Sequence, residues 1–162
     1  MKIYELTHIC FEYKGESVLN ELELGFYSDI DTALSAKSYY LSLPGFGENE
    51  HGFLIKPRVV NGNVSNDEIF NAYLYIHTQD LEFEYVVPAG LFSCEDDADA
   101  AVQEIFNCNS FDGGKFEVEM IIERCILNEM PGDFYDGFKI YTYDRKYPEG
   151  ADIIPVWVDE DE

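Results

Sequence analysis

Four acidic side chains crowd the start of one amphipathic segment: Glu95, Asp96, Asp97 and Asp99. The apolar residues that follow have helical spacing, so these acids are expected in the first turn of a helix, where the helix dipole favours negative charge. Clustered carboxylates attract multivalent cations and basic protein surfaces. The spacing lacks the glycine and the distal glutamate of an EF-hand calcium loop. We therefore interpret the four residues as a candidate partner-binding surface, and no metal ligand is predicted.

Cysteine and histidine are the other reactive side chains, and neither type forms a catalytic motif. Cys94 directly precedes the acidic cluster, whose charge disfavours a thiolate, so we expect no special reactivity there. His8 and His77 fall in the first strand of each half of the chain, which fits either a symmetric metal site or a duplicated structural position. We favour the structural position, because neither histidine has a spaced His or Cys partner. The sequence predicts no catalytic residue and no cofactor.

The elements that carry these residues occur twice. The segment Gly25–Ser28 reappears as Gly90–Ser93, and Ala33 and Ala36 fall on Ala98 and Ala101 at the same offset. The strand pattern around His8 matches that around His77 at a slightly larger offset, so duplication is expected to place both histidines on the same strand face. We interpret the chain as an internal repeat.

Each copy predicts two strands, a helix and a third strand. Alternating apolar residues indicate strands over residues 4–10, 20–26 and 52–60 in the first copy and over 73–77, 82–92 and 116–122 in the second. Each helix is expected to begin at an S-x-x-D capping box, at Ser28 and at Ser93. The predicted apolar faces are Ile30, Ala33, Leu34, Lys37 and Leu41 in the first helix, and Ala98, Ala101, Val102, Ile105 and Phe106 in the second.

The fold class predicted from this pattern is α+β. Two tandem ββαβ repeats, residues 1–66 and 67–128, are expected to pack together as one compact unit of mostly antiparallel sheet with one helix per repeat. Neither repeat is large enough to bury a generous core alone. Residues 129–162 form a C-terminal extension with a short strand near residues 138–143, an apolar patch around Pro155 and an acidic tail.

Charge is distributed unevenly between the two copies. The 162 residues carry a net charge of −23, and residues 67–162 hold 24 acidic but only five basic side chains. Such a field repels nucleic acid phosphates and anionic membrane surfaces and attracts basic proteins. No run is long and apolar enough for a membrane helix, and the N-terminal residues lack the apolar region of a signal peptide. We therefore expect a cytoplasmic protein with reduced cysteines that binds neither nucleic acid directly nor membranes.

One pair of motifs resembles a known family. Leu43–Phe46 gives the letters L-P-G-F and Gly52–Ile55 gives G-F-x-I, a signature similar to that of a small bacterial domain family of unknown function. The resemblance covers residues 1–60, and the second copy lacks the signature. It implies a fold and a bacterial or phage origin, and no activity or site.

The function expected from these observations is that of a non-enzymatic acidic interaction module with a basic protein partner, such as an immunity protein, an antitoxin or a DNA-mimicking inhibitor. One alternative is a carboxylate-based metal-dependent enzyme or metal-binding domain with its site between the repeats. The other is a homo-oligomeric structural protein that associates through its strand edges and its 24 Tyr and Phe residues.

Overall fold

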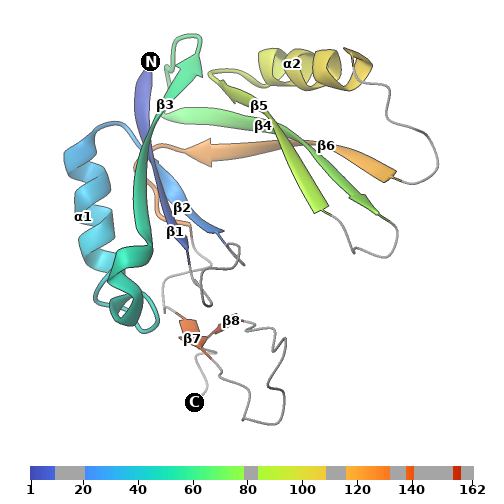
Figure 1. Cartoon of the computed structure of the whole chain (residues 1–162). Coiled ribbons are helices and arrows are strands. Elements are labelled where there is room, and N and C mark those ends of the chain that lie inside the picture. The colour runs from blue at the N-terminus through green and yellow to red at the C-terminus, as the bar shows by residue number, and fades with distance from the viewer. Residues whose placement is uncertain (10–20, 79–83, 109–115, 132–137, 141–154, 158–162) are drawn as a thin grey trace. The chain divides into compact units, whose positions relative to one another are not determined.

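The computed structural model describes residues 1–9, 21–78, 84–108, 116–131, 138–140 and 155–157. The fold is α+β, as predicted, with helices and a mixed sheet (Figure 1). Cys10 and the acidic tail lie outside the described residues. The elements follow in the order β1 (Lys2–Ile9), β2 (Glu21–Tyr27), α1 (Ile30–Tyr40), the 3-10 helix η1 (Gly47–Gly52), β3 (Phe53–Asn61), β4 (Glu68–Thr78), β5 (Glu84–Phe92), α2 (Glu95–Cys108), β6 (Phe116–Ile126), β7 (Phe138–Ile140) and β8 (Pro155–Trp157).

Six strands are hydrogen-bonded in the order β2-β1-β3-β5-β4-β6, and β7 pairs with β8 in a separate antiparallel sheet. The β1–β2, β4–β5 and β4–β6 pairs are antiparallel, whereas β3 and β5 pair in parallel over two residues. Met1 and Val60 exchange both backbone hydrogen bonds, at 2.9 and 2.8 Å, which is the antiparallel arrangement. The first strand of each half is therefore the central strand of its own triplet.

By contact the chain divides into two units, each built from two separate stretches. Residues 1–3 and 57–127 form unit 1, and residues 4–56 and 128–162 form unit 2. Strands β1 and β3 pass from one unit into the other, so contact does not follow the order of the chain. The predicted repeat boundaries at residues 66 and 128 describe sequence similarity rather than contact and stay predictions.

A β-bulge interrupts the hairpin of each half at corresponding positions. The β1–β2 register shifts between Glu5 and Thr7, next to Gly25, and the β4–β5 register shifts between Ala72 and Tyr73, next to Gly90. Both glycines have positive φ, +109° and +135°, a region that side chains with a Cβ rarely adopt. The two bulges lie 65 residues apart, the offset of the sequence repeat.

Helix α1 differs from its prediction at the cap and on its buried face. Asp29, not Ser28, caps the helix: its carboxylate accepts from the Thr32 N–H at 2.8 Å and from the Thr32 hydroxyl at 2.9 Å. These bonds lower the pKa of Asp29. The buried residues of the helix are Ala33, Ala36 and Tyr40.

The predicted stripe on α1 was wrong at Ile30 and Leu34, which are 46% and 45% exposed. The pattern misled because leucine and isoleucine outweigh alanine in any reading of apolar spacing, whereas here the small alanines lie against the sheet. Lys37 does lie along the apolar side, with Nζ 5.6 Å from the centre of the Phe53 ring.

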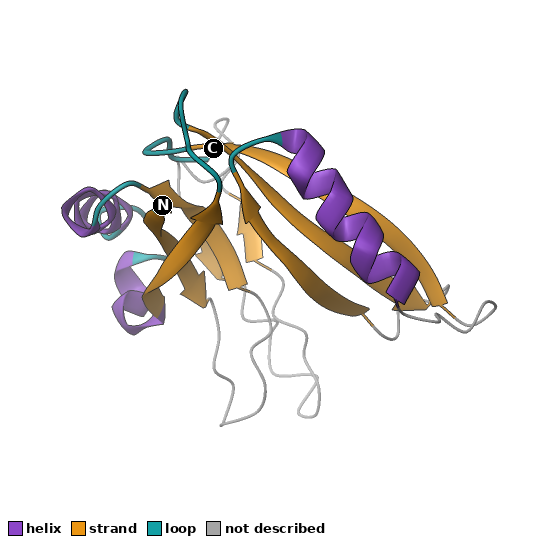
Figure 2. Cartoon of the chain, turned by 90° about the horizontal axis from the view of Figure 1, so that it is seen from above, coloured by secondary structure: helices purple, strands orange, loops and turns teal. Residues whose placement is uncertain are grey.

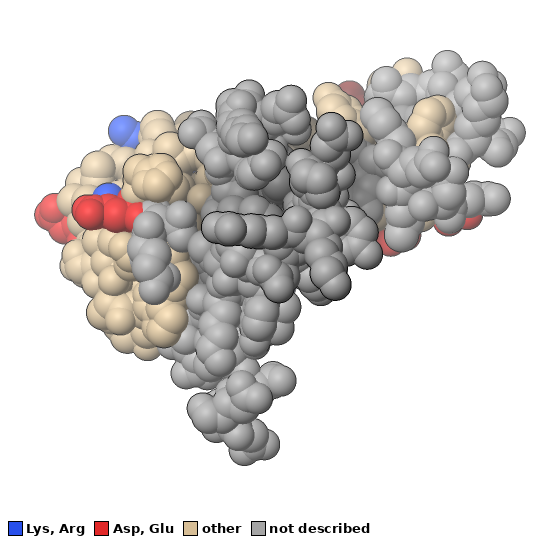
Figure 3. Space-filling model, turned by 60° about the horizontal axis from the view of Figure 1, so that its bottom comes forward, with Lys and Arg blue, Asp and Glu red and all other residues tan. Residues whose placement is uncertain are grey.

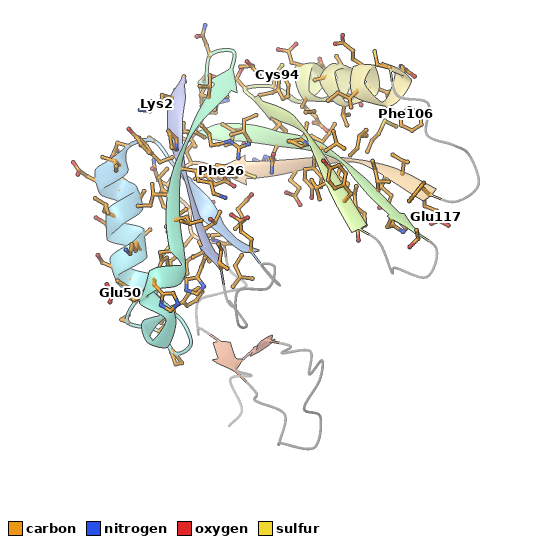
Figure 4. The ribbon with its side chains drawn as sticks, viewed as in Figure 1. Lys2, Phe26, Glu50, Cys94, Phe106 and Glu117 are labelled. Atoms are coloured by element: carbon orange, nitrogen blue, oxygen red, sulfur yellow. The ribbon has the colours of Figure 1, made fainter. Side chains whose placement is uncertain are left out.

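The predicted apolar face of α2 is confirmed. Ala98 and Val102 are buried against β4, and Ala101, Ile105 and Phe106 pack beside them. Figure 2 shows the helix lying along one face of its sheet, and in Figure 4 Phe106 is on the side of α2 that faces the strands. The helix begins at Glu95, two residues after Ser93.

His8 is enclosed by the residues of the family-like signature. Its ring is fully buried, and its centroid lies 5.0 Å from that of Phe46 and 4.6 Å from that of Phe53, both edge-on. A Cβ on Gly52 would overlap the Ile9 carbonyl oxygen and lie 2.8 Å from His8 Nε2. Leu43 and Ile55 pack against the same cluster. The signature residues other than Pro44, which is exposed, are therefore buried or half-buried in unit 2.

Candidate functional site

The four acids at the start of α2 are all exposed. Glu95, Asp96 and Asp97 occupy the first turn and Asp99 follows in the second, and the last turn has no basic residue. The helix dipole stabilises carboxylates at this end. Part of the reason for these acids is thus local to the helix, and their exposure leaves them accessible to a partner.

Three of the four cysteines are described, and none of the three forms a disulfide bond. Cys94 and Cys108 are exposed and Cys125 is half-buried. Figure 4 shows Cys94 where the chain enters α2, beside the acidic turn. Among the described residues around Cys94, none supplies a base or a metal ligand to its thiol.

The expectation that His8 and His77 share a strand face is wrong. Leu22 and Val87 are equivalent residues, because they are separated by the repeat offset of 65 residues. His8 lies opposite Leu22 and Leu74 lies opposite Val87, so His8 corresponds to Leu74 and not to His77. His77 is three residues further along β4, and an odd displacement in a strand reverses the side-chain direction. His8 packs in the cluster that includes α1 residues, whereas His77 lies on the face of its sheet away from α2.

That second face of the β5-β4-β6 sheet carries tyrosine and glutamate side by side. Antiparallel pairing places Tyr75 opposite Glu119 and His77 opposite Glu117, and paired residues project to the same face. Their neighbours in sequence, Leu74 and Ile76, face α2 instead. We call this surface the tyrosine–glutamate face, defined by Tyr73, Tyr75, His77, Glu117, Glu119, Ile121 and Glu123.

Two diagonal hydrogen bonds fix carboxylates on this face. The Tyr73 hydroxyl donates to Glu123 Oε1 at 2.8 Å, and His77 Nε2 lies 3.1 Å from Glu119 Oε1. All three glutamates of the face are nevertheless exposed. In Figure 4, Glu117 stands near the start of β6. Each bond holds one carboxylate oxygen and leaves the other able to accept further hydrogen bonds.

His77 is held by acceptors at both ring nitrogens. Nδ1 lies 3.2 Å from the Thr78 carbonyl oxygen, and Nε2 contacts Glu119 and lies 4.0 Å from Glu117 Oε2. Only the doubly protonated ring donates to both sides at once. The bond to Thr78, followed by the bond to Glu119, therefore raises the pKa of His77 above its ordinary value.

This pair gives a pH-dependent stability. A raised folded-state pKa means that His77 stabilises the fold fully at a pH below its unfolded value and that this contribution is lost as the pH rises through the folded value. Urea unfolding of the wild type and His77→Gln at several pH values between 5 and 9 should therefore show a difference that shrinks as the pH rises. The remaining carboxylates affect both proteins alike, so a difference independent of pH would contradict the role of the protonated ring.

Within the described ranges, no group of three or more His, Cys, Asp or Glu is arranged to hold a metal ion. No helix in the described part of the chain has both the length and the apolar character needed to cross a bilayer.

The tyrosine–glutamate face is not evident from the amino-acid sequence. The alternation of Tyr73 and Tyr75 with Leu74 and Ile76 was visible, as was that of the glutamates in β6. What the sequence lacks is the register between strands that are about 45 residues apart, and only that register puts Tyr75 opposite Glu119. The tyrosines and glutamates of two separate strands thus become one surface only in the folded chain.

No family model, no curated protein and no solved structure matches this chain. The resemblance drawn from Leu43–Phe46 and Gly52–Ile55 therefore stays a prediction, and the function rests on the molecule itself.

Proposed function

We propose that this protein is a non-enzymatic acidic interaction module that binds a basic protein partner. The observation that carries the proposal is the exposure of its acids: all eight acidic side chains described between residues 85 and 127 are exposed, and Arg124 is the one basic residue described there. The eight are Glu95, Asp96, Asp97, Asp99, Glu104, Glu117, Glu119 and Glu123.

Within unit 1 the charge is carried by more than one element, α2 and β6. Described acidic side chains are exposed on the face drawn in Figure 3. A distributed negative field accelerates encounter with a positively charged partner from many directions. It supports occlusion of a basic functional surface, the mode of action of an immunity protein, an antitoxin or a DNA-mimicking inhibitor, in the cytoplasm of a bacterial cell.

Within this field, Glu95, Asp96, Asp97 and Asp99 are proposed to contribute to partner binding. They are exposed at the N-terminal end of α2, where the helix dipole carries a partial positive charge. The attraction of a basic partner to this end therefore comes from the four carboxylates. Their four carboxylates provide the largest number of negative charges in any five consecutive described residues.

The ββαβ duplication belongs to this proposal. Its support is that both halves have the same element order, the same central strand and a bulge next to a positive-φ glycine at matching positions, Gly25 and Gly90. A duplicated scaffold frees one copy to change its surface, and the second copy has acquired most of the charge.

Affinity capture from lysate at two salt concentrations tests the proposal. The Debye screening length falls from about 10 Å at 0.1 M salt to about 3 Å at 1 M salt. Basic proteins retained at 0.1 M salt should therefore be released at 1 M. The retained partner is then purified and its affinity measured. Partners without net positive charge, or retention unaffected by salt, would contradict the proposal.

A pair of charge-matched variants locates the contribution of α2. Replacing Glu95, Asp96, Asp97 and Asp99 by their amides should weaken binding of the purified partner at least tenfold, because the loss of four negative charges slows its association. The control replaces four exposed acids elsewhere, Asp31, Glu50, Asp67 and Glu129, by amides. Equal weakening by both variants would mean that only the net charge matters.

A further inference from the structure

We infer that the tyrosine–glutamate face of β4 and β6 is the docking surface for an arginine-rich segment of the basic partner. The inference rests on the proposed function and deepens it, because it names the side chain that is recognised and the face that recognises it. The acids of α2 then act over distance, and the face makes the direct contacts.

No described helix of unit 1 covers the face, on which the glutamates are exposed and His77 is buried. The described helix of unit 1, α2, packs on the opposite side of the sheet, through residues such as Val102 against Leu74 and Ile76. The glutamates of β6 and Val86 of β5, which lies opposite Tyr75, are exposed. A sheet face with aromatic residues at its centre and carboxylates along its edge has the composition of a protein-binding surface.

On this face three glutamates accompany one basic side chain, His77, which is paired with Glu119. Among the described side chains of β4, β5 and β6, Arg124 is the one Lys or Arg, and it lies opposite Phe70, whose side chain packs in the cluster beneath α2. Arg124 also pairs with Glu68. The tyrosine–glutamate face therefore presents Glu117, Glu119 and Glu123 without a lysine or arginine from these strands, which makes it complementary to a cationic segment.

The carboxylates are spaced and oriented for repeated contacts. Residues two apart in a strand are about 7 Å apart on one face, so Glu117, Glu119 and Glu123 form a row along β6. Glu119 and Glu123 are each held through one oxygen, by His77 and Tyr73. A side chain already fixed in place loses less conformational freedom when a ligand binds.

Arginine fits this arrangement better than lysine. A guanidinium group donates two parallel hydrogen bonds to one carboxylate and interacts favourably with the rings of tyrosine. Tyr73 and Tyr75 lie across from the glutamate row, and the Tyr75 ring is 5.0 Å from the ring of His77 at 34°. An ammonium group has neither the flat shape nor the fork of donors that these neighbours match.

The test uses the full-length protein with two synthetic probes, peptides of nine arginines and of nine lysines. The arginine peptide should bind at least threefold more tightly and should shift the backbone amide NMR signals of β4 and β6 around Tyr75 and Glu119. Shifts confined to residues 95–99 would overturn the assignment to the face. Shifts that arise when the protein alone is concentrated would show that a second copy occupies the face, and would also overturn it.

Kinetics on variants separates the face from the general field. The variant Glu117→Gln/Glu119→Gln/Glu123→Gln should raise the dissociation rate of the arginine peptide about tenfold, whereas amide variants of the α2 acids should mainly lower the association rate. Asp31→Asn/Glu50→Gln/Glu129→Gln is the charge-matched control, and circular dichroism checks that each variant is folded. A dissociation rate raised by the α2 variant instead would overturn this inference while leaving the proposed function intact. Absence of binding to either peptide together with capture of no basic protein would defeat both.

Discussion

Replacing Phe46 by alanine is expected to lower the free energy of unfolding by about 3–5 kcal/mol, the range for large buried aromatic side chains. The Phe46 side chain is fully buried and contacts three other rings, with centroid distances of 5.0 Å to His8, 5.1 Å to Tyr40 and 5.8 Å to Phe53. Its removal leaves a cavity that these rings, held by strands and by α1, cannot readily fill. Urea unfolding followed by circular dichroism measures the loss.

The matched control for this substitution is Leu34→Ala on α1. Leu34 is one of the large apolar residues of the predicted stripe, yet it is 45% exposed, and alanine is a better helix former than leucine. Its free energy of unfolding should stay within about 0.5 kcal/mol of the wild type. A larger loss at Leu34 than at Phe46 would contradict the observed orientation of α1 and restore the predicted one.

Gly25→Ala should destabilise the protein by about 3 kcal/mol. The backbone at Gly25 has φ of +109°, and a Cβ there would lie 2.9 Å from the Glu129 carbonyl oxygen and 3.2 Å from the Tyr27 hydroxyl. The strained conformation alone costs about 1–3 kcal/mol, and the close backbone oxygen adds to it. Thermal and urea unfolding of the variant test the prediction.

Gly90→Ala is the internal comparison for that experiment. Gly90 also has positive φ, +135°, but the nearest atoms to its Cβ would be those of the Phe92 ring at 3.4 Å, which is ordinary contact. We expect a loss of about 1–2 kcal/mol from the backbone alone. If Gly90→Ala proves the more damaging change, the crowding around Gly25 by the chain near Glu129 is not what sets its cost.

Sequence analysis predicted the strands and helices well where the pattern was strong. Alternation located β2 and β6, and the stripe from Ala98 to Phe106 located α2 with its correct face, because the apolar residues there are regularly spaced and the residues between them are mostly polar. The signature around Phe46 was noticed as a resemblance, and its physical role, enclosure of His8, required the structure.

The error on α1 has a local cause, whereas the surface that the sequence did not reveal depends on long-range pairing. In α1 the buried positions are alanines and Tyr40, whose small or amphipathic side chains give a weak stripe, so Ile30 and Leu34 dominated the prediction. The prediction of Glu95, Asp96, Asp97 and Asp99 as a partner-binding surface stays a prediction, and the sequence left open whether the acids of the second copy share one face. The glutamates of β6 became a candidate surface only through their register with Tyr73 and Tyr75, which depends on long-range pairing.

Each unit is built from two separate stretches of the chain, and this has a consequence for synthesis on the ribosome. The Asn128 N–H donates to the Phe26 carbonyl oxygen, and the Asn128 side-chain oxygen accepts the N–H of Ser28, 100 residues away along the chain. Met1 likewise pairs with Val60, which is synthesised much later. The first copy therefore emerges long before the segment that completes its unit. Closing such long loops is slow, so the nascent chain passes through a stage with unpaired strand edges before most of the 24 acidic side chains of residues 67–162 have been added.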